Sequence, residues 1–227
     1  MPDTPSRLAA AGTPLSWYGT LVGAFAALLV VSNIAAVKLI GLGRLELFGT
    51  GIDITVDGGA LLFPLTYVLG DVLAEVFGFK AARRAIWVGF VCAALAVGSF
   101  WLVGVAPPAA NWLGQGAFTQ TLGFVPRVVA ASLAGYLAGQ LSNAFTLTAM
   151  KRRADTALWR RLLGSTLVGE LADTAVFCTV AFYGVITGPQ FFGYAALGYI
   201  YKCLAEVVLL PITYGVIRAT RRHEARL

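Results

Sequence analysis

Six long apolar runs alternate with short polar or charged connections along the chain. The runs occupy residues 17–41, 59–79, 82–104, 122–150, 163–187 and 193–217. As a helix with a rise of 1.5 Å per residue, each run is about 30 Å long or more, which is enough to cross the hydrocarbon core of a bilayer. The pattern therefore predicts an all-α polytopic membrane protein with six transmembrane helices.

Two connections have patterns of their own. Residues 42–58 alternate apolar and polar positions around two glycines, which predicts a short β-hairpin lid in the first external loop. Residues 105–121 carry no charge and contain two adjacent prolines, so we expect a loop or an interfacial segment there.

The two ends of the chain differ from the apolar middle. Residues 1–16 hold three prolines and one arginine without the pattern of a cleaved signal peptide. We therefore expect a disordered cytoplasmic tail over 1–16, a six-helix membrane domain over 17–217 and a basic cytoplasmic tail over 218–227.

Composition supports a membrane protein. Of the 227 residues, 58% are hydrophobic and 12% are charged, whereas soluble domains carry about 25% charged residues. The basic clusters at 80–84, 151–161 and 218–226 follow the second, fourth and sixth runs. By the positive-inside rule, both termini are predicted to be cytoplasmic. This placement also accounts for the net charge of +6 without a nucleic-acid partner.

Cysteine and histidine give no sign of a metal site or of a bound cofactor. Cys92, Cys178 and Cys203 all fall inside the apolar runs and form no Cys-x-x-Cys pair. The single histidine, His223, lies in the basic tail. We expect no metal and no cofactor.

Polar side chains interrupt the apolar runs at positions that share a helix face. Tyr67, Asp71 and Glu75 are spaced four residues apart, so on a helix they lie one above another. The fourth, fifth and sixth runs contain similar polar positions, and the first contributes an asparagine. The candidate substrate-binding residues are Asn33, Tyr67, Asp71, Glu75, Gln140, Asn143, Glu170, Asp173, Lys202 and Glu206.

The charges within the runs do not balance. Five acids face at most three cations, namely Lys38, Arg127 and Lys202. Charges inside a membrane cost about 2.5 kcal/mol or more, so they normally face a bundle interior or a watery cavity. At least two carboxylates must be protonated, solvated or neutralised by a bound group. This excess predicts a transport pathway.

Structural roles are open alternatives for three of these acids. Glu75 is five residues from Lys80 and could reach the cytoplasmic interface. Glu170 could pair with a cytoplasmic arginine, and Lys202 with Glu206 could form a pair within one helix.

A faint internal repeat favours a central site. GDVLAEVF at 70–77 is similar to GELADTAVF at 169–177, and a Ser-Asn pair occurs at 32–33 and again at 142–143. Two three-helix halves must have opposite orientations, and inverted repeats often place a substrate site at their interface.

Several strings resemble the queuosine precursor transporter family, also described as vitamin-uptake-like transporters. They are SNIAAVKL, GALLFPLTYVLGDVLAEVFGFKAARRAIWVGF, GYLAGQLSN, LWRRLLGSTLVGELADTAVF and YKCLAEVVLLPITY, spread from about residue 30 to 215. The resemblance implies six spans in a bacterial inner membrane. It also implies import of 7-cyano-7-deazaguanine or 7-aminomethyl-7-deazaguanine, bases used to modify tRNA.

The candidate residues suit such a base. A carboxylate can accept the ring N–H and the amino group of a guanine-like edge together, while amides serve its other polar atoms and an aromatic ring stacks on it. Which carboxylate binds the base is left open, as is the preferred precursor. One hypothesis is that a buried acid carries a proton as the coupling ion; the alternative is facilitated diffusion.

Two other classes of function are alternatives to a complete transporter. A substrate-binding membrane subunit of an ATP-driven uptake complex would also have six short spans, although this chain has no Walker A sequence of its own. An intramembrane enzyme using Asp71 and Asp173 is disfavoured because the sequence offers no activated nucleophile. Six spans make a small transporter, which is compatible with a homodimer.

Overall fold

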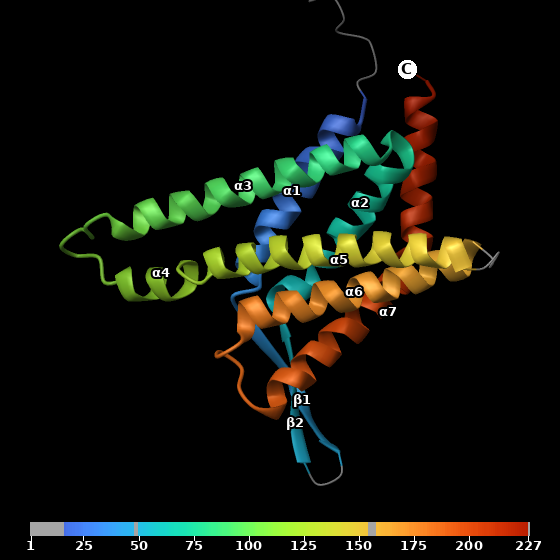
Figure 1. Cartoon of the computed structure of the whole chain (residues 1–227). Coiled ribbons are helices and arrows are strands. Elements are labelled where there is room, and N and C mark those ends of the chain that lie inside the picture. The colour runs from blue at the N-terminus through green and yellow to red at the C-terminus, as the bar shows by residue number, and fades with distance from the viewer. Residues whose placement is uncertain (1–15, 48–49, 154–157, 227) are drawn as a thin grey trace, which may run out of the picture.

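The computed structural model describes residues 16–47, 50–153 and 158–226, and most of them are helical (Figure 1). The elements in chain order are α1 (Tyr18–Ala35), β1 (Leu39–Leu47), β2 (Thr50–Asp57), the 3-10 helix η1 (Gly58–Leu61), α2 (Phe63–Phe77), α3 (Phe79–Val105), α4 (Gln115–Leu122), α5 (Val125–Arg153), α6 (Leu158–Phe182) and α7 (Pro189–Glu224). The predicted tail over 1–16 lies, except for residue 16, outside the described residues.

Helices of the length and apolarity needed to cross a membrane make up much of the fold. Within the described ranges, four stretches qualify: Tyr18–Ala35, Lys80–Val105, Gln115–Gly139 and Pro189–Glu224. The helices α2 and α6 coincide with the second and fifth predicted runs. With 15 residues, α2 is about 22 Å long and so shorter than a usual span. A polytopic membrane protein is confirmed, whereas the number six remains a prediction.

The predicted β-hairpin is present. Strand β1 pairs antiparallel with β2, with Leu39 opposite Asp57 and an irregularity between Gly41 and Gly43. Gly43 has a φ of 122°, which L side chains rarely adopt. The first predicted run reached residue 41, but α1 ends at Ala35. That boundary was wrong because the apolar residues after it belong to a strand.

The 105–121 connection is only partly a loop. Helix α4 begins at Gln115, whose side-chain Nε2 donates a 2.8 Å hydrogen bond to the carbonyl oxygen of Gly104. The ring of Trp112 packs edge-on against Phe118, with centroids 6.3 Å apart. These contacts fold α4 back beside the end of α3, so a loop was wrong for the second half of the connection, and an interfacial segment stays a prediction.

The two ends of the described chain lie side by side (Figure 1). The backbone N–H of Trp17 donates a 2.7 Å hydrogen bond to Oε1 of Glu224, and the Trp17 ring stacks on His223 at 4.4 Å. Most of the segment predicted as a basic tail over 218–227 is the last part of α7, which continues to Glu224. Basic residues in its last turn suit the negative end of the helix dipole.

Helices α5 and α6 form a closely packed antiparallel pair (Figure 1). A Cβ atom on Gly139 would lie 2.9 Å from Cβ of Asp173, and one on Gly135 would lie 2.7 Å from its Oδ1. Two small residues four apart allow backbones to approach in this way in membrane helices. The absence of side chains at Gly135 and Gly139 therefore brings Asp173 close to α5.

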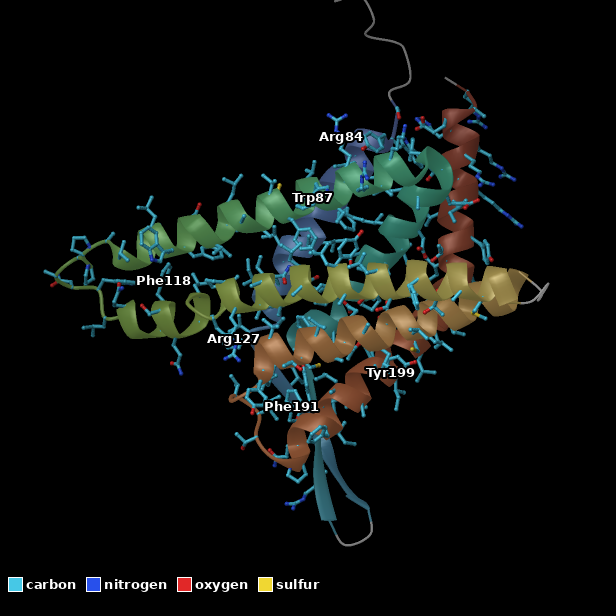
Figure 2. All side chains as sticks on the ribbon, viewed as in Figure 1. Arg84, Trp87, Phe118, Arg127, Phe191 and Tyr199 are labelled. Carbon is cyan, nitrogen blue, oxygen red and sulfur yellow. The ribbon has the colours of Figure 1, made fainter. Side chains whose placement is uncertain are left out.

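Arg127, near the start of α5, contacts the backbone at the carboxyl end of α6 (Figure 2). Its Nε donates a 2.7 Å hydrogen bond to the carbonyl oxygen of Val180, and its Nη2 donates a 2.5 Å bond to that of Tyr183. Carbonyl groups in the last turn of a helix lack N–H partners within that helix, and the guanidinium supplies donors to Val180 in the last turn of α6 and to Tyr183 just after it. Arg127 thus stabilises a helix end and does not neutralise one of the acids.

Candidate functional site

A cavity of about 400 Å³ lies between the helices. Its walls come mainly from α2, α6 and α7, with contributions from α1, α3, α5 and the end of β2. This volume falls within the range of about 300–1,000 Å³ that is usual for small-molecule sites.

The lining combines aromatic rings with a few charged groups. Its charged side chains are Asp57, Asp71, Arg83, Glu170, Asp173 and Lys202, and its aromatic side chains are Phe25, Phe63, Tyr67, Phe90, Tyr136, Phe177, Tyr194 and Tyr201. Apolar walls with few polar groups are typical of sites that orient a small ligand.

Lys202 is the centre of a charged cluster on one wall. Its Nζ contacts Oδ2 of Asp173 directly and lies 3.8 Å from Oε2 of Glu170. The ammonium group also lies 5.9 Å from the centroid of the Phe177 ring and interacts with Tyr67 of α2. Lys202 thus forms ion pairs from α7 to α6, while the alternative pair with Glu206 involves a side chain outside what the structure describes.

The side chains of this cluster remain partly accessible from the cavity. About a fifth of each is exposed: 18% of Lys202, 21% of Asp173 and 22% of Glu170. Two oxygens nearby, Oε2 of Glu170 and Oγ1 of Thr174, are buried without a hydrogen-bond partner in the part of the chain that the structure describes. The cluster therefore has hydrogen-bonding capacity that this structure does not use.

The cavity is accessible at one end. The exposed residues of its lining are Asp71 and Ala74 on α2 and Arg83 on α3, which lie close to the α2–α3 junction. Figure 2 shows nitrogen-bearing side chains gathered around Arg84 and the carboxyl end of α7, at the end of the molecule away from the hairpin. The open end thus lies near the first and third basic clusters.

The other end of the cavity is closed by contacts between η1 and α7. The Tyr194 hydroxyl donates a 2.7 Å hydrogen bond to Oδ2 of Asp57, and the Tyr201 hydroxyl donates one of 2.7 Å to the carbonyl oxygen of Ala60. Oδ1 of Asp57 accepts a further bond from the backbone N–H of Ala60. We call Asp57, Ala60, Tyr194 and Tyr201 the hairpin seal.

Asp57 precedes the second predicted span, and its environment favours the protonated form. Burial raises the pKa of the Asp57 carboxyl, while the hydrogen bonds from Tyr194 and Ala60 act in the opposite direction. The loss of solvation is the larger effect.

Five predicted site residues are brought together. Tyr67, Asp71, Glu170, Asp173 and Lys202 all line the cavity, although they come from three helices. The shared face predicted for Tyr67 and Asp71 therefore points into the cavity.

Glu75 lies outside this group. Its Oε1 forms an ion pair with Nη2 of Arg221 on α7, and both side chains are more than half exposed. The interfacial alternative describes Glu75 better than a position in the cavity, because the Arg221 side chain reaches it from the basic end of α7.

Asn33 is also not part of the cavity lining. Its Nδ2 donates a 2.8 Å hydrogen bond to the carbonyl oxygen of Leu29, and its Oδ1 accepts one of 2.7 Å from Ser132. The side chain is 1% exposed and joins α1 to α5. The side chains of Gln140, Asn143 and Glu206 lie outside what the structure describes.

The hairpin seal was missed by the sequence interpretation. Asp57 fell in a connection rather than in an apolar run, and its partner Tyr194 is 137 residues away. Tyr194 and Tyr201 are seven residues apart and so share a helix face, which is the one signal that could have drawn attention to them.

The part of the chain that the structure covers holds no cluster of three His, Cys, Asp or Glu residues suited to a metal ion. Cys178 is buried, and Cys92 and Cys203 are partly buried.

Comparison with known proteins identifies relatives over most of the chain. The family described as "Putative vitamin uptake transporter" matches residues 57–216. A protein of Bacillus subtilis (strain 168) named "Probable queuosine precursor transporter" is 32% identical over 190 residues, which cover 82% of this chain and 78% of the relative. The "Queuosine precursor transporter" of Escherichia coli (strain K12) is 28% identical over 165 residues, covering 70% of this chain and 71% of the relative.

A third relative, from Haemophilus influenzae and also named "Probable queuosine precursor transporter", is 29% identical over 162 residues, or 70% of this chain and 67% of its own. No solved structure matches the chain. The family match covers the cavity-lining part of α2 and all of α6, together with most of α7, and the identity to the Bacillus relative extends over most of both chains. The chain therefore belongs to the vitamin uptake transporter family.

Proposed function

We propose that this protein imports 7-deazaguanine precursors of queuosine across the bacterial inner membrane. The observation that carries the proposal is the similarity to proteins named queuosine precursor transporters over 70% to 82% of the chain. The cavity adds independent support, since its volume and its mixture of aromatic and carboxylate groups suit a flat heterocycle with several N–H donors.

The chemistry of the cavity suits a guanine-like edge. Such an edge presents a ring N–H beside an amino group, and one carboxylate accepts both in a bidentate arrangement. Asp71 at the open end and Asp173 beside Lys202 are the candidates for this acceptor. Tyr67 and Phe177 supply aromatic faces on which the base can stack.

The orientation in the membrane follows from the basic clusters. We place the open end of the cavity, with Arg83, toward the cytoplasm and the hairpin on the outer side, with both termini cytoplasmic. In this arrangement α2 and α6 complete six crossings. In this proposed orientation the cavity is open toward the cytoplasm, and the hairpin seal blocks access from outside.

A complete secondary transporter accounts for these features better than a subunit of an ATP-driven complex. The names of the three relatives described above are those of transporters, two of them with the word "Probable", and mention no ATP-driven complex. Import of the intact base requires no bond in it to be made or broken, so we assign no catalytic residues.

The first experiment is uptake in bacteria that cannot synthesise the deazaguanine precursors and lack their own importer. The cells express the native chain, Asp173→Asn or Glu75→Gln and receive 7-cyano-7-deazaguanine at low concentration. Queuosine in tRNA is then scored by boronate gel retardation. We expect modification with the native chain and with Glu75→Gln, whose site lies outside the cavity, and a strong reduction with Asp173→Asn.

The result that would contradict the proposal is absence of modification with the native chain while it is present in the membrane. A second assay separates transport by this chain alone from transport that needs a partner. The purified protein in vesicles should exchange labelled base for unlabelled base, whereas a requirement for an added ATPase would favour the subunit function.

A further inference from the structure

The charged cluster on α6 and α7 contains two carboxylates and one cation. The ammonium group of Lys202 contacts Asp173 directly, whereas Glu170 lies at 3.8 Å, beyond hydrogen-bonding distance. One positive charge neutralises one carboxylate. If Glu170 is ionised, the cluster therefore keeps a net charge of −1 inside the membrane.

Apart from the Lys202 ammonium at 3.8 Å, which also contacts Asp173, the described surroundings of Glu170 offer little stabilisation for that charge. Its Oε2 is buried, and no described residue donates a hydrogen bond to it. An ionised carboxylate accepts hydrogen bonds only, and a buried one without donors is costly. Protonation of the Glu170 carboxylate removes its negative charge and gives it an O–H group that can donate a hydrogen bond.

The titratable groups around Glu170 come from three helices. Lys202 and Tyr199 approach from α7, Asp173 is three residues along α6, and Tyr67 approaches from α2. On the α5 side, Gly139 faces α6 without a side chain: a Cβ there would lie 2.9 Å from Cβ of Asp173 and 3.1 Å from the carbonyl oxygen of Gly169, the residue before Glu170. Lys202 is the one cation in this described set, and it is already in contact with Asp173.

Glu170 also has access to water. Its side chain is 22% exposed and lines the cavity, which is open at the end with Asp71 and Arg83. A proton on Glu170 can therefore leave through the same cavity that releases the base.

We propose that Glu170 is the binding site for a proton that is transported together with the base. The inference rests on the proposed import function and specifies its coupling ion. When the cavity is open to the outside, a proton from the outer solution binds the Glu170 carboxylate. The cluster is then neutral while both ends of the cavity are closed. When the cavity opens inward, the proton dissociates to the cytoplasm. No other bond forms or breaks, and one positive charge enters with each base.

The test uses the purified full-length chain in lipid vesicles with labelled 7-cyano-7-deazaguanine. Two activities are measured: accumulation driven by an outside that is more acidic than the lumen, and exchange of internal for external base without a gradient. The native chain should accumulate the base in response to the proton gradient and not to a sodium gradient. Its exchange rate should change with pH.

Glu170→Gln carries a permanent amide that resembles the neutral acid. We expect this variant to lose accumulation driven by the proton gradient, while its exchange persists and no longer depends on pH. Glu75→Gln is the matched control, because it is the same chemical change at a residue paired with Arg221 outside the cavity. Glu170→Asp keeps a titratable group and should retain accumulation with a displaced pH profile.

Three outcomes would overturn the inference. The first is accumulation by Glu170→Gln at the native level in response to the proton gradient. The second is coupling of the native chain to sodium instead of protons. The third is that Glu170→Gln loses both exchange and accumulation. The last outcome would make Glu170 a base-binding group. Failure of the native chain to exchange the base at all would instead reject the proposed function, so the two failures are distinguishable.

Discussion

The hydroxyl of Tyr194 on α7 donates a 2.7 Å hydrogen bond to Asp57 at the end of β2, and this contact closes one end of the cavity. Both residues are almost fully buried, at 4% and 8% exposure. A buried carboxylate oxygen that loses its donor bears a desolvation cost of about 1–3 kcal/mol. The bond therefore contributes to stability as well as to closure.

Tyr194→Phe should lower the stability of the protein in detergent by about 1–3 kcal/mol because it removes that donor. Thermal unfolding can be followed with a thiol-reactive dye, since Cys178 is 2% exposed in the folded chain. Tyr214→Phe is the matched control at a residue that is 61% exposed. Equal unfolding temperatures for the two variants would show that the bond does not stabilise the fold.

The difference in stability between Asp57→Asn and the native chain should depend on pH. Burial raises the pKa of Asp57, so the folded state binds a proton more tightly than the unfolded state does. The native chain should lose stability as the pH rises from the ordinary carboxyl pKa through the raised one, and the asparagine variant should lack this component. Unfolding temperatures of both proteins across that pH range give the comparison. A constant difference would argue against an elevated pKa.

Gly139→Ala should destabilise the contact between α5 and α6 and reduce uptake. The added Cβ would lie 2.9 Å from Cβ of Asp173, which is closer than real side-chain contacts, so the Asp173–Lys202 pair must shift. Gly98→Ala is the control, because a Cβ there meets nothing within 4 Å. In a helix interior this control should be neutral or stabilising by up to about 1 kcal/mol. Uptake and unfolding temperature are both measured, and equal behaviour of the two variants would refute the close packing.

Asn33 and Asp71 should respond differently to removal of their polar groups. Asn33→Ala breaks the link between α1 and α5, so we expect less folded protein in the membrane and an unchanged KM for the base. Asp71→Asn removes a charge from the cavity lining, so we expect an increased KM with normal amounts of protein. Uptake kinetics normalised to membrane protein separate the two effects. An increased KM for Asn33→Ala would place that residue in the binding site after all.

Apolar runs and turn signals predicted most of the architecture. The positions of the long helices and of the β-hairpin follow from local sequence, because helix length and strand alternation are properties of neighbouring residues. Local sequence could not assign the boundary of α1, since Leu39 and Ile40 are as compatible with a helix as with strand β1, which pairs with β2.

The candidate site was predictable in part for a related reason. Helix periodicity places Asp71 and Glu75 on one face, but it does not show which side chains of other helices contact that face. Arg221 on α7 forms an ion pair with Glu75, whose side chain lies outside the cavity. For Asn33 the sequence could not distinguish two roles, because a buried amide can join two helices, as it does here, or bind a ligand. The hairpin seal depends on a contact between residues 137 positions apart, for which one sequence carries no signal.

Helix α7 contains 36 residues, and it carries Tyr194, Lys202 and Arg221 in turn. Pro211 lies between the last two and supplies no backbone N–H, which makes it a natural point of bending. Arg221 beyond it is docked on α2. If the segment before Pro211 tilted about the proline as a hinge, the Tyr194–Asp57 hydrogen bond would break and the Lys202 ammonium would move at the same time.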